Sequence, residues 1–271
     1  MKVFCMLGDK RALRSKTPAM YTKILKRVGM KGACVPFMVE PDQIGQALQS
    51  IKVLNMTGAI LTIPFKETVI PHLDILSEGA NIIGAVNTII YDGKILKGYN
   101  TNAIGFMDAV DEAGFDLTGK SALVFGSGGT ARAVVFILNW LRAASIFIAG
   151  ENEEKTFQIT KQIGGETKSL ESLPDKPVLV DIVVNATVQS TIDEMPEFAD
   201  LVNRLETPEC KLIVDMNYGS EENFWKDMAD SRGIKFIDAL PVLAHQAKRT
   251  FALLTKTQVD TYEFMKALES L

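Results

Sequence analysis

Cysteine and histidine are scarce in this chain of 271 residues, which contains three of the former and two of the latter. Cys5, Cys34 and Cys210 are odd in number and widely separated, so they match neither a disulfide framework nor a zinc-ligand spacing. A reducing, cytoplasmic environment fits such cysteines best. Neither His72 nor His245 has sequence neighbours that mark it as catalytic, and the sequence predicts no metal site.

An excess of basic charge and a long apolar run are also missing. The net charge of −4 offers no basic surface for a phosphate backbone, so nucleic acid is not an expected partner. No apolar run approaches the ~18 residues of a membrane span, and no signal-peptide pattern opens the chain. Hydrophobic residues make up 47% of the sequence, which is enough for one large domain or two ordinary ones, each with a core.

Short apolar, β-branched runs alternate with longer amphipathic stretches, a pattern typical of βαβ units and largely parallel sheets. In the first part of the chain we predict strands at 2–7, 33–40 and 58–63, and helices at 18–29, at 41–54 and from about residue 65. Asp92-Gly93 lies between two alternating runs and predicts a hairpin within 85–100. The pattern then restarts with strands at 121–125, 145–150, 180–187 and 211–218 and a helix at 130–144.

This arrangement predicts an α/β protein of two domains. The first domain boundary lies near residues 101–103, and the chain returns toward the first domain after IKFIDALP. We therefore expect one domain of residues 1–101 with 239–271, and a second of residues 102–238.

The second domain contains a glycine-rich turn. In LVFGSGGTARAVV, Gly126, Gly128 and Ala131 have the spacing G-x-G-x-x-A directly between a predicted strand and a predicted helix. Such a turn lets a pyrophosphate approach bare backbone at a helix N-terminus, and its last position needs a small residue where helix meets strand. A plain tight turn is the alternative, but the flanking elements are those that a dinucleotide site requires. We expect a Rossmann-type dinucleotide-binding domain.

An acidic residue follows the next predicted strand. Glu151 lies about twenty residues beyond the glycines, where a carboxylate reaches the adenosine ribose hydroxyls and repels the extra phosphate of NADP. No arginine replaces it, and Lys155 is the first basic residue after the strand. The cofactor is therefore NAD or NADP, with NAD favoured by Glu151. The alternative is a solvated surface glutamate in GENEEK.

Polar residues of the first domain fall at the ends of predicted strands. ILTIPFKE places Thr62 and Lys66 around Pro64, so Lys66 follows a buried strand near the carboxyl edge of the sheet, where ligands bind. A lysine in a partly closed apolar cleft has a lowered pKa and can exchange protons near neutrality, as a ketone–alcohol oxidoreductase requires. For this segment alone, a helix-start lysine in water is the alternative.

Taken together, eight segments resemble the shikimate dehydrogenase family: SKTP (15–18), GAILTIPFK (58–66), GAVNT (84–88), GYNTNAIGF (98–106), GSGGTARA (126–133), NAT (185–187), DMNY (215–218) and AHQAKRTF (244–251). They run over nearly the whole chain in the family's order. The resemblance implies an N-terminal α/β substrate domain joined to a Rossmann domain, with a cleft between them and the last helices packed on the first domain. It also implies reversible NADPH-dependent reduction of 3-dehydroshikimate, a step of the chorismate pathway to aromatic amino acids. Some relatives use NAD or act on quinate or aminoshikimate.

The resemblance also implies residue roles. Ser15 and Thr17 bind the carboxylate of a small-molecule substrate, Thr62, Asn87 and Gln246 hold its ring hydroxyls, and Lys66 is the catalytic acid/base. The residues implied to bind the cofactor are Gly126, Gly128, Gly129, Ala131, Glu151, Asn185 and Thr187. The family usually has serine at the position of Thr17, and threonine occurs there in relatives that accept quinate. The assembly is expected to be a monomer or a homodimer.

Several departures from the family fall in the site. The pattern G-x-N-T-D-G-x-G becomes GYNTNAIG, so Asn102 replaces the aspartate that partners the catalytic lysine, and Ala103 replaces the next glycine. Ile60, Gly150-Glu151 and Ala239 stand where the family has an asparagine, an asparagine-arginine pair and a glycine, and NATVQST lacks the usual Ser-x-Gly. Asn102 keeps the size and hydrogen-bonding ability of an aspartate but not its charge.

Two functions therefore remain open. One is a working oxidoreductase in which Asn102 slows turnover or suits a different alicyclic hydroxy acid. The other is a ligand- or nucleotide-binding protein that no longer catalyses. The retained Lys66 favours the first, because a pure binding protein has little use for a lysine at the reacting position.

Overall fold

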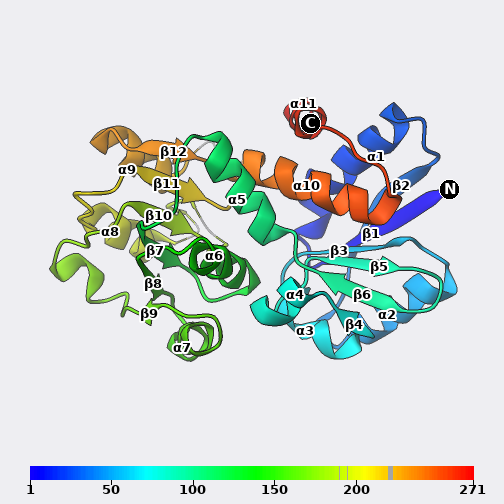
Figure 1. Ribbon diagram of the computed structural model, residues 1–271, viewed down its shortest axis with the longest axis horizontal. Coiled ribbons are helices and arrows are strands. Elements are labelled where there is room, and N and C mark those ends of the chain that lie inside the picture. The colour runs from blue at the N-terminus through cyan, green and yellow to red at the C-terminus, as the bar shows by residue number, and fades with distance from the viewer. Residues whose placement is uncertain (189, 194, 219–221) are drawn as a thin grey trace. The chain divides into compact units, whose positions relative to one another are not determined.

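The structure is a computed structural model that describes residues 1–188, 190–193, 195–218 and 222–271 (Figure 1). The chain forms two compact units, which we call unit 1 (Met1–Gly105 with Leu243–Leu271) and unit 2 (Phe106–Val242). Each unit contains a six-stranded sheet. The division falls inside helices α5 (Asn102–Glu112) and α10 (Ala239–Thr255), whereas the sequence places it at the starts of those helices.

The sheet of unit 1 is parallel except for one hairpin strand. Its strands are β1 (Lys2–Gly8), β2 (Gly32–Met38), β3 (Gly58–Leu61), β4 (Ile75–Leu76), β5 (Thr88–Tyr91) and β6 (Leu96–Tyr99), in the order β2-β1-β3-β5-β6-β4. β5 runs antiparallel to β3 and β6 because the chain reverses at Asp92-Gly93, where the sequence predicts a hairpin. Gly93 has a φ of +95°, a conformation that glycine adopts without strain.

The helices of unit 1 are α1 (Thr17–Arg27), α2 (Ile44–Val53), α3 (Phe65–Thr68), α4 (Glu78–Ile83), the later part of α10, and α11 (Thr261–Glu269). α3 has only four residues, since Pro71 lies in the 3-10 turn Ile70–His72 that follows and cannot continue an α-helix. α10 and α11 pack on α1 through aromatic rings: Tyr21 stacks on Phe251 at 6.3 Å and meets Phe264 edge-on. The last helices therefore belong to the core of unit 1, as the family resemblance implies.

The sheet of unit 2 is parallel throughout. Its strands are β7 (Ser121–Phe125), β8 (Ser145–Ala149), β9 (Glu166–Thr167), β10 (Ile182–Asn185), β11 (Leu212–Asp215) and β12 (Lys235–Ile237), in the order β12-β11-β10-β7-β8-β9. Besides the end of α5, its helices are α6 (Gly129–Trp140), α7 (Glu153–Gln162), α8 (Pro196–Arg204) and α9 (Phe224–Arg232). This is the Rossmann strand order. Successive strands are added outward on one side from β7 and on the other side from β10, so the topological switch point lies between these two strands. Ligands of such sheets bind outside the carboxyl ends of the strands at that point.

The core of unit 2 is aromatic under the α8–α9 face of the sheet. Trp225 is fully buried and its ring lies 5.1 Å from Phe125 and 6.0 Å from Phe198. These contacts hold the carboxyl end of β7 against α8 and α9 and so fix the start of the glycine-rich turn. In the described part of the chain, no helix is both long and apolar enough to cross a membrane.

Candidate functional site

Two of the predicted substrate residues, Thr62 and Asn87, lie at one edge of the unit 1 sheet. β3 ends at Leu61, and its backbone N–H donates to the carbonyl of Asn87 (2.8 Å). The backbone N–H of Asn87 in turn donates to the carbonyl of Tyr99 at the end of β6 (3.0 Å). Since β5 is antiparallel to both neighbours, its first residues meet the last residues of β3 and β6. The segments that contain Thr62, Asn87 and Asn102 therefore come together at this edge.

Thr62 is placed by close packing against the end of β1. A Cβ atom on Gly8 would lie 2.2 Å from Thr62 Cγ2 and 3.2 Å from the carbonyl oxygen of Ile63, so Gly8 leaves room for both. The backbone N–H of Thr62 donates to Leu7 (3.0 Å), and the Thr62 carbonyl accepts from Phe65 at the start of α3 (2.9 Å). The side chain of Thr62 stays partly exposed.

Lys66 is the second residue of α3, directly after this turn. Its carbonyl accepts a hydrogen bond from the backbone N–H of Val86 (2.6 Å), so the backbone of Lys66 is bonded to the residue that precedes Asn87. The side chain is partly buried, and desolvation lowers the pKa of Lys66 to about 8, against a small opposing effect of the Glu67 carboxylate. An amine with this pKa can give and take a proton near neutral pH.

Asn87 is the centre of a buried, neutral hydrogen-bond network. Its Nδ2 donates to Thr101 Oγ1 (2.8 Å) and to Asn102 Oδ1 (2.6 Å), and its Oδ1 accepts from the backbone N–H of Thr101 (2.8 Å). Thr250 of α10 closes the network, with its hydroxyl 2.9 Å from that of Thr101 and 3.0 Å from that of Thr88. The structure thus brings the predicted residues Asn87 and Asn102 into direct contact.

The loop after β6 is fixed by its own amides. Asn100 Nδ2 donates to the carbonyl of Ala85 (3.0 Å), and Asn100 Oδ1 accepts from the backbone N–H of Asn102 (3.0 Å). Thr101 is fixed by Asn87, as described above. The polar residues of GYNTN therefore hold the loop in place, and within the described part of the chain Nδ2 of Asn102 makes no hydrogen bond.

The other predicted substrate residues are positioned by α1 and α10. Ser15 precedes α1, and its hydroxyl accepts from the backbone N–H of Thr17 (3.2 Å), while Thr17 itself is buried. Gln246 lies one helical turn before Thr250 on α10, so the two side chains project from the same face of the helix. Because Thr250 joins the Asn87 network, that face is turned toward Asn87 and Thr101.

In unit 2, the glycine-rich turn is as tight as the sequence predicts. Gly126 has a φ of +123°, and a Cβ on it would lie 2.7 Å from the carbonyl oxygen of Ala186 in the loop after β10. Gly128 is the N-cap residue of α6 and offers no side chain there. Gly129 and Ala131 are buried where α6 meets β7. Such a turn exposes backbone N–H groups at a helix N-terminus, the arrangement that accepts a pyrophosphate.

Glu151 follows β8 and is exposed to solvent. The end of β8 lies against the glycine-rich turn, because a Cβ on Gly150 would be 3.3 Å from the carbonyl carbon of Gly126. The next residue, Asn152, caps α7 by accepting from the backbone N–H of Lys155 (2.9 Å). Glu151 therefore stands beside the turn on the side of β8, where a Rossmann protein binds the adenosine ribose.

Asn185 and Thr187 bond to one another in the loop after β10. Asn185 Oδ1 accepts from the Thr187 backbone N–H (3.1 Å) and hydroxyl (2.7 Å), and Asn185 Nδ2 donates to Asp215 Oδ1 (2.9 Å). Asn185 is fully buried and Thr187 only partly. Of the two, Thr187 can still meet a ligand.

Sequence reasoning missed the group at the centre of this region, the carboxylate of Asp215. It is fully buried at the end of β11 and accepts from three asparagine side chains: Asn185 (2.9 Å), Asn217 (3.0 Å) and Asn223 (2.6 Å). Burial raises the pKa of Asp215, and hydrogen bonds from Ser190, from the side chains of Asn223 and Asn185 and from the backbone of Asn217 oppose the increase. DMNY is one of the family segments, so its aspartate was visible in the sequence, but its partners were not. We call these five residues the Asp215 cluster.

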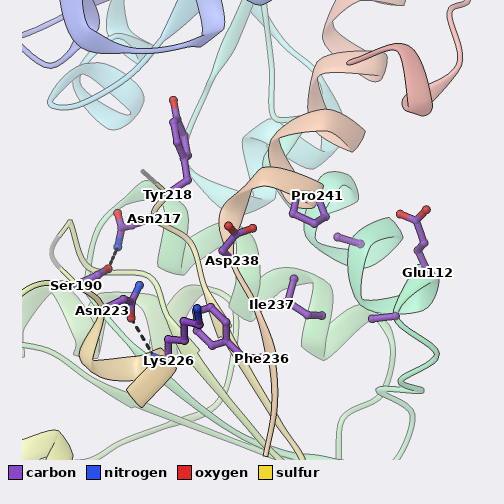
Figure 2. Close-up of a pocket in the computed structure, with 12 residues that line it drawn as sticks. Glu112, Ser190, Asn217, Tyr218, Asn223, Lys226, Phe236, Ile237, Asp238 and Pro241 are labelled. Carbon is purple, nitrogen blue, oxygen red and sulfur yellow. Dashed lines mark hydrogen bonds between the residues drawn. The ribbon is translucent and has the colours of Figure 1, made fainter. Parts of the chain in front are cut away.

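A cavity of about 490 Å³ lies beside this cluster within unit 2 (Figure 2). Figure 2 shows Ser190, Asn217 and Asn223 gathered on one side of the cavity and Glu112 on the other. Asn217 Nδ2 donates to Ser190 Oγ (3.0 Å), and Asn223 Oδ1 accepts from the backbone N–H of Lys226 (3.1 Å). The polar wall of the cavity is therefore held by bonds among its own residues. Within the described ranges, no group of three or more His, Cys, Asp or Glu residues is placed to hold a metal ion.

The Rossmann strand order and the glycine-rich turn define a dinucleotide-binding α/β protein. Comparison with known proteins is more specific. Residues 9–89 match the shikimate dehydrogenase substrate binding domain, and residues 109–218 match the family described as shikimate / quinate 5-dehydrogenase. The chain belongs to the shikimate dehydrogenase family, a family of oxidoreductases.

Individual relatives match over most of their length. The chain is 37% identical to shikimate dehydrogenase (NADP(+)) of Desulforamulus reducens over 253 residues, covering 89% of this chain and 86% of the relative. It is 31% identical to the enzyme of the same name from Caldanaerobacter subterraneus, covering 94% and 91% of the two chains. Shikimate 5-dehydrogenase of Thermus thermophilus, solved in complex with NADP(H) and shikimate, superposes with a TM-score of 0.86 at 29% identity, covering 100% and 99% of the two chains.

Proposed function

We propose that this chain is an NAD(P)-dependent oxidoreductase that interconverts 3-dehydroshikimate and shikimate, or a related alicyclic hydroxy acid such as quinate or aminoshikimate. The observation that carries the proposal is Lys66, a partly buried lysine whose pKa is lowered to about 8 at the polar edge of unit 1. The names of the relatives agree with this chemistry.

The residues of unit 2 fit a nicotinamide dinucleotide. At Gly126 a side chain would collide with the backbone of Ala186, and Gly128 caps α6 without a side chain, so both leave backbone bare for a pyrophosphate. Gly129, Ala131, Asn185 and Thr187 support or border the same turn. When bound, the dinucleotide supplies or accepts a hydride.

Lys66 carries the proton in this proposal. In the direction of reduction, its ammonium group gives a proton to the substrate oxygen as the carbonyl carbon becomes an alcohol carbon. In the direction of oxidation, its neutral amine takes the hydroxyl proton. A pKa of about 8 makes both forms available near neutral pH, so one residue serves both directions.

The remaining polar side chains of unit 1 bind the substrate. Ser15 and Thr17 offer hydroxyl groups to its carboxylate at the start of α1. Thr62, Asn87 and Gln246 hold its ring hydroxyls from the turn after β3, from the position just before β5 and from α10. None of these groups is charged, so selectivity depends on hydrogen-bond geometry.

We propose NAD as the preferred cofactor. Glu151 is exposed beside the glycine-rich turn, and it is followed by Glu153 and Glu154 before the first basic residue, Lys155. A 2′-phosphate placed there would meet negative charge with no arginine to bind it, whereas the hydroxyls of an NAD ribose can donate to a carboxylate.

A second candidate function is favoured by one observation. Asn102 replaces the aspartate of the family, so Lys66 lacks that neighbouring carboxylate. A protein that keeps both ligand sites but has lost a group worth ~10²–10⁴-fold in rate could serve as a binding protein.

The test is a spectrophotometric assay at 340 nm with NAD and with NADP against shikimate, quinate and aminoshikimate. We expect turnover with at least one substrate, faster with NAD than with NADP. Turnover with NADP alone would remove the cofactor preference but keep the enzyme. No turnover with any pair, while calorimetry still detects NAD binding, would favour the binding protein.

A further inference from the structure

The orientation of the Asn87 amide is fixed by a group that can only donate. The backbone N–H of Thr101 lies 2.8 Å from one polar atom of the Asn87 side chain, so that atom must be the carbonyl oxygen Oδ1. The other polar atom of the same side chain is then the donor Nδ2. Amide orientations are otherwise ambiguous, and here a backbone group removes the ambiguity.

The orientation of the Asn102 amide follows from that of Asn87. Asn87 Nδ2 lies 2.6 Å from the Asn102 side chain, so the atom that faces it must be the acceptor Oδ1. Turning the Asn102 amide over would place two NH2 groups against one another. Asn102 Nδ2 is therefore directed away from Asn87.

Asn102 Nδ2 is available to a ligand. Asn102 as a whole is only 4% exposed, and within the described part of the chain its Nδ2 makes no hydrogen bond. This nitrogen is not one of the fully buried side-chain atoms without a hydrogen-bond partner, which among the described residues are on Thr207, Trp225 and Glu263. The small exposed part of Asn102 therefore includes the amide nitrogen.

From this geometry we infer that Asn102 is a specificity-determining residue that selects a substrate oxygen able to accept a hydrogen bond. This inference rests on the proposed function. An aspartate at position 102 could accept from Asn87 with one oxygen, but its other oxygen could only accept from the ligand. Asn102 offers a donor at that place instead. The preferred substrate is an alicyclic acid in which the group facing Asn102 is a carbonyl, an ether or another acceptor and has no need to donate.

Replacing a ring hydroxyl by a carbonyl tests this directly, because the carbonyl oxygen accepts a hydrogen bond and cannot donate one. The probes are shikimate and its keto analogues, one for each ring hydroxyl. Their dissociation constants are measured by calorimetry without a cofactor, so that no turnover occurs, for the unchanged protein and for Asn102→Asp. Asn81→Asp is the matched control, because it makes the same chemical change at an exposed position of unit 1.

At one ring position, we expect the unchanged protein and Asn81→Asp to bind the keto analogue within about threefold of shikimate. Asn102→Asp should prefer the hydroxyl compound by about tenfold or more, because the carboxylate loses its only donor. The ratio for the unchanged protein is decisive even if Asn102→Asp fails to fold.

Two outcomes overturn the inference, and they are distinguishable. The inference fails, while the proposed function stands, if the unchanged protein prefers the hydroxyl compound tenfold at every ring position. It also fails if Asn102→Asp shows the same ratios as the unchanged protein. If neither protein binds shikimate or any analogue, the proposed substrate class is wrong and this inference fails with it.

Discussion

The polar edge of unit 1 is built from side chains, whereas the glycine-rich edge of unit 2 is built mainly from backbone. In unit 1, Asn87, Thr101 and Asn102 are neutral, bonded to one another and placed beside Lys66. In unit 2, the glycine-rich turn is bare, and the polar side chains of the neighbouring loops point inward to the carboxylate of Asp215.

This difference separates two ways of building a site. A single substitution can change the chemistry of a site built from side chains. Asn102 is such a substitution, because either an amide or a carboxylate at this position can accept the hydrogen bond from Asn87. A backbone site depends on space, so it tolerates no added atom at Gly126 but depends little on which polar residues lie nearby.

The largest effect should come from Gly126→Ala. The added Cβ lies 2.7 Å from the carbonyl oxygen of Ala186, and a φ of +123° is unfavourable for alanine, so the turn must shift. We expect the dissociation constant for NAD to rise by about 100-fold and the free energy of unfolding to fall by about 2–4 kcal/mol. Calorimetry and thermal unfolding measure the two.

Gly119→Ala is the matched control for this variant. Gly119 also has a positive φ of +69°, but no atom outside its neighbours lies within 4 Å of an added Cβ. It should cost about 1–2 kcal/mol of stability and leave NAD binding unchanged. Equal loss of NAD binding in both variants would mean that backbone strain, and not the contact with Ala186, explains the effect.

A smaller effect on binding, but a clear one on stability, is expected for Asp215→Ala. Removing the carboxylate leaves the amides of Asn185, Asn217 and Asn223 without their shared acceptor, which should lower the free energy of unfolding by about 2–4 kcal/mol. NAD affinity should fall less than in Gly126→Ala, because the turn itself is intact. Chemical denaturation and calorimetry provide the comparison.

The control is Asp200→Ala. Asp200 pairs with Arg204 on the surface of α8, where both side chains are more than half exposed, so the change should cost at most about 0.5 kcal/mol. If Asp215→Ala were as mild as Asp200→Ala, the Asp215 cluster would not hold the loops of unit 2.

The sequence predicts those parts of the fold that have local causes. The strand at 121–125 has a continuous apolar run, the hairpin has Asp92-Gly93, and the dinucleotide turn has its glycine spacing. Each signal lies within a few residues of the structure that it produces, so it can be read without knowing the fold.

The networks could not be predicted in this way, because their members are distant in sequence. Thr101 and Thr250 are 149 positions apart and meet only when α10 packs on unit 1. Asn185 and Asp215 meet because β10 and β11 are neighbours in the sheet. The helix predicted from about residue 65 begins at Phe65 as α3, but its early end at Thr68 was not predicted, although Pro71 is a visible local signal for it.

The most direct test of the account is the pH dependence of kcat/KM in both directions, compared between the unchanged protein and Lys66→Met. Since burial lowers the pKa of Lys66 to about 8, the oxidation rate should rise and the reduction rate should fall as the pH passes through about 8. Lys66→Met should lose turnover in both directions and still bind NAD. Turnover that survives in Lys66→Met, or rates that change in the same direction with pH, would contradict the assignment of Lys66 as the acid/base.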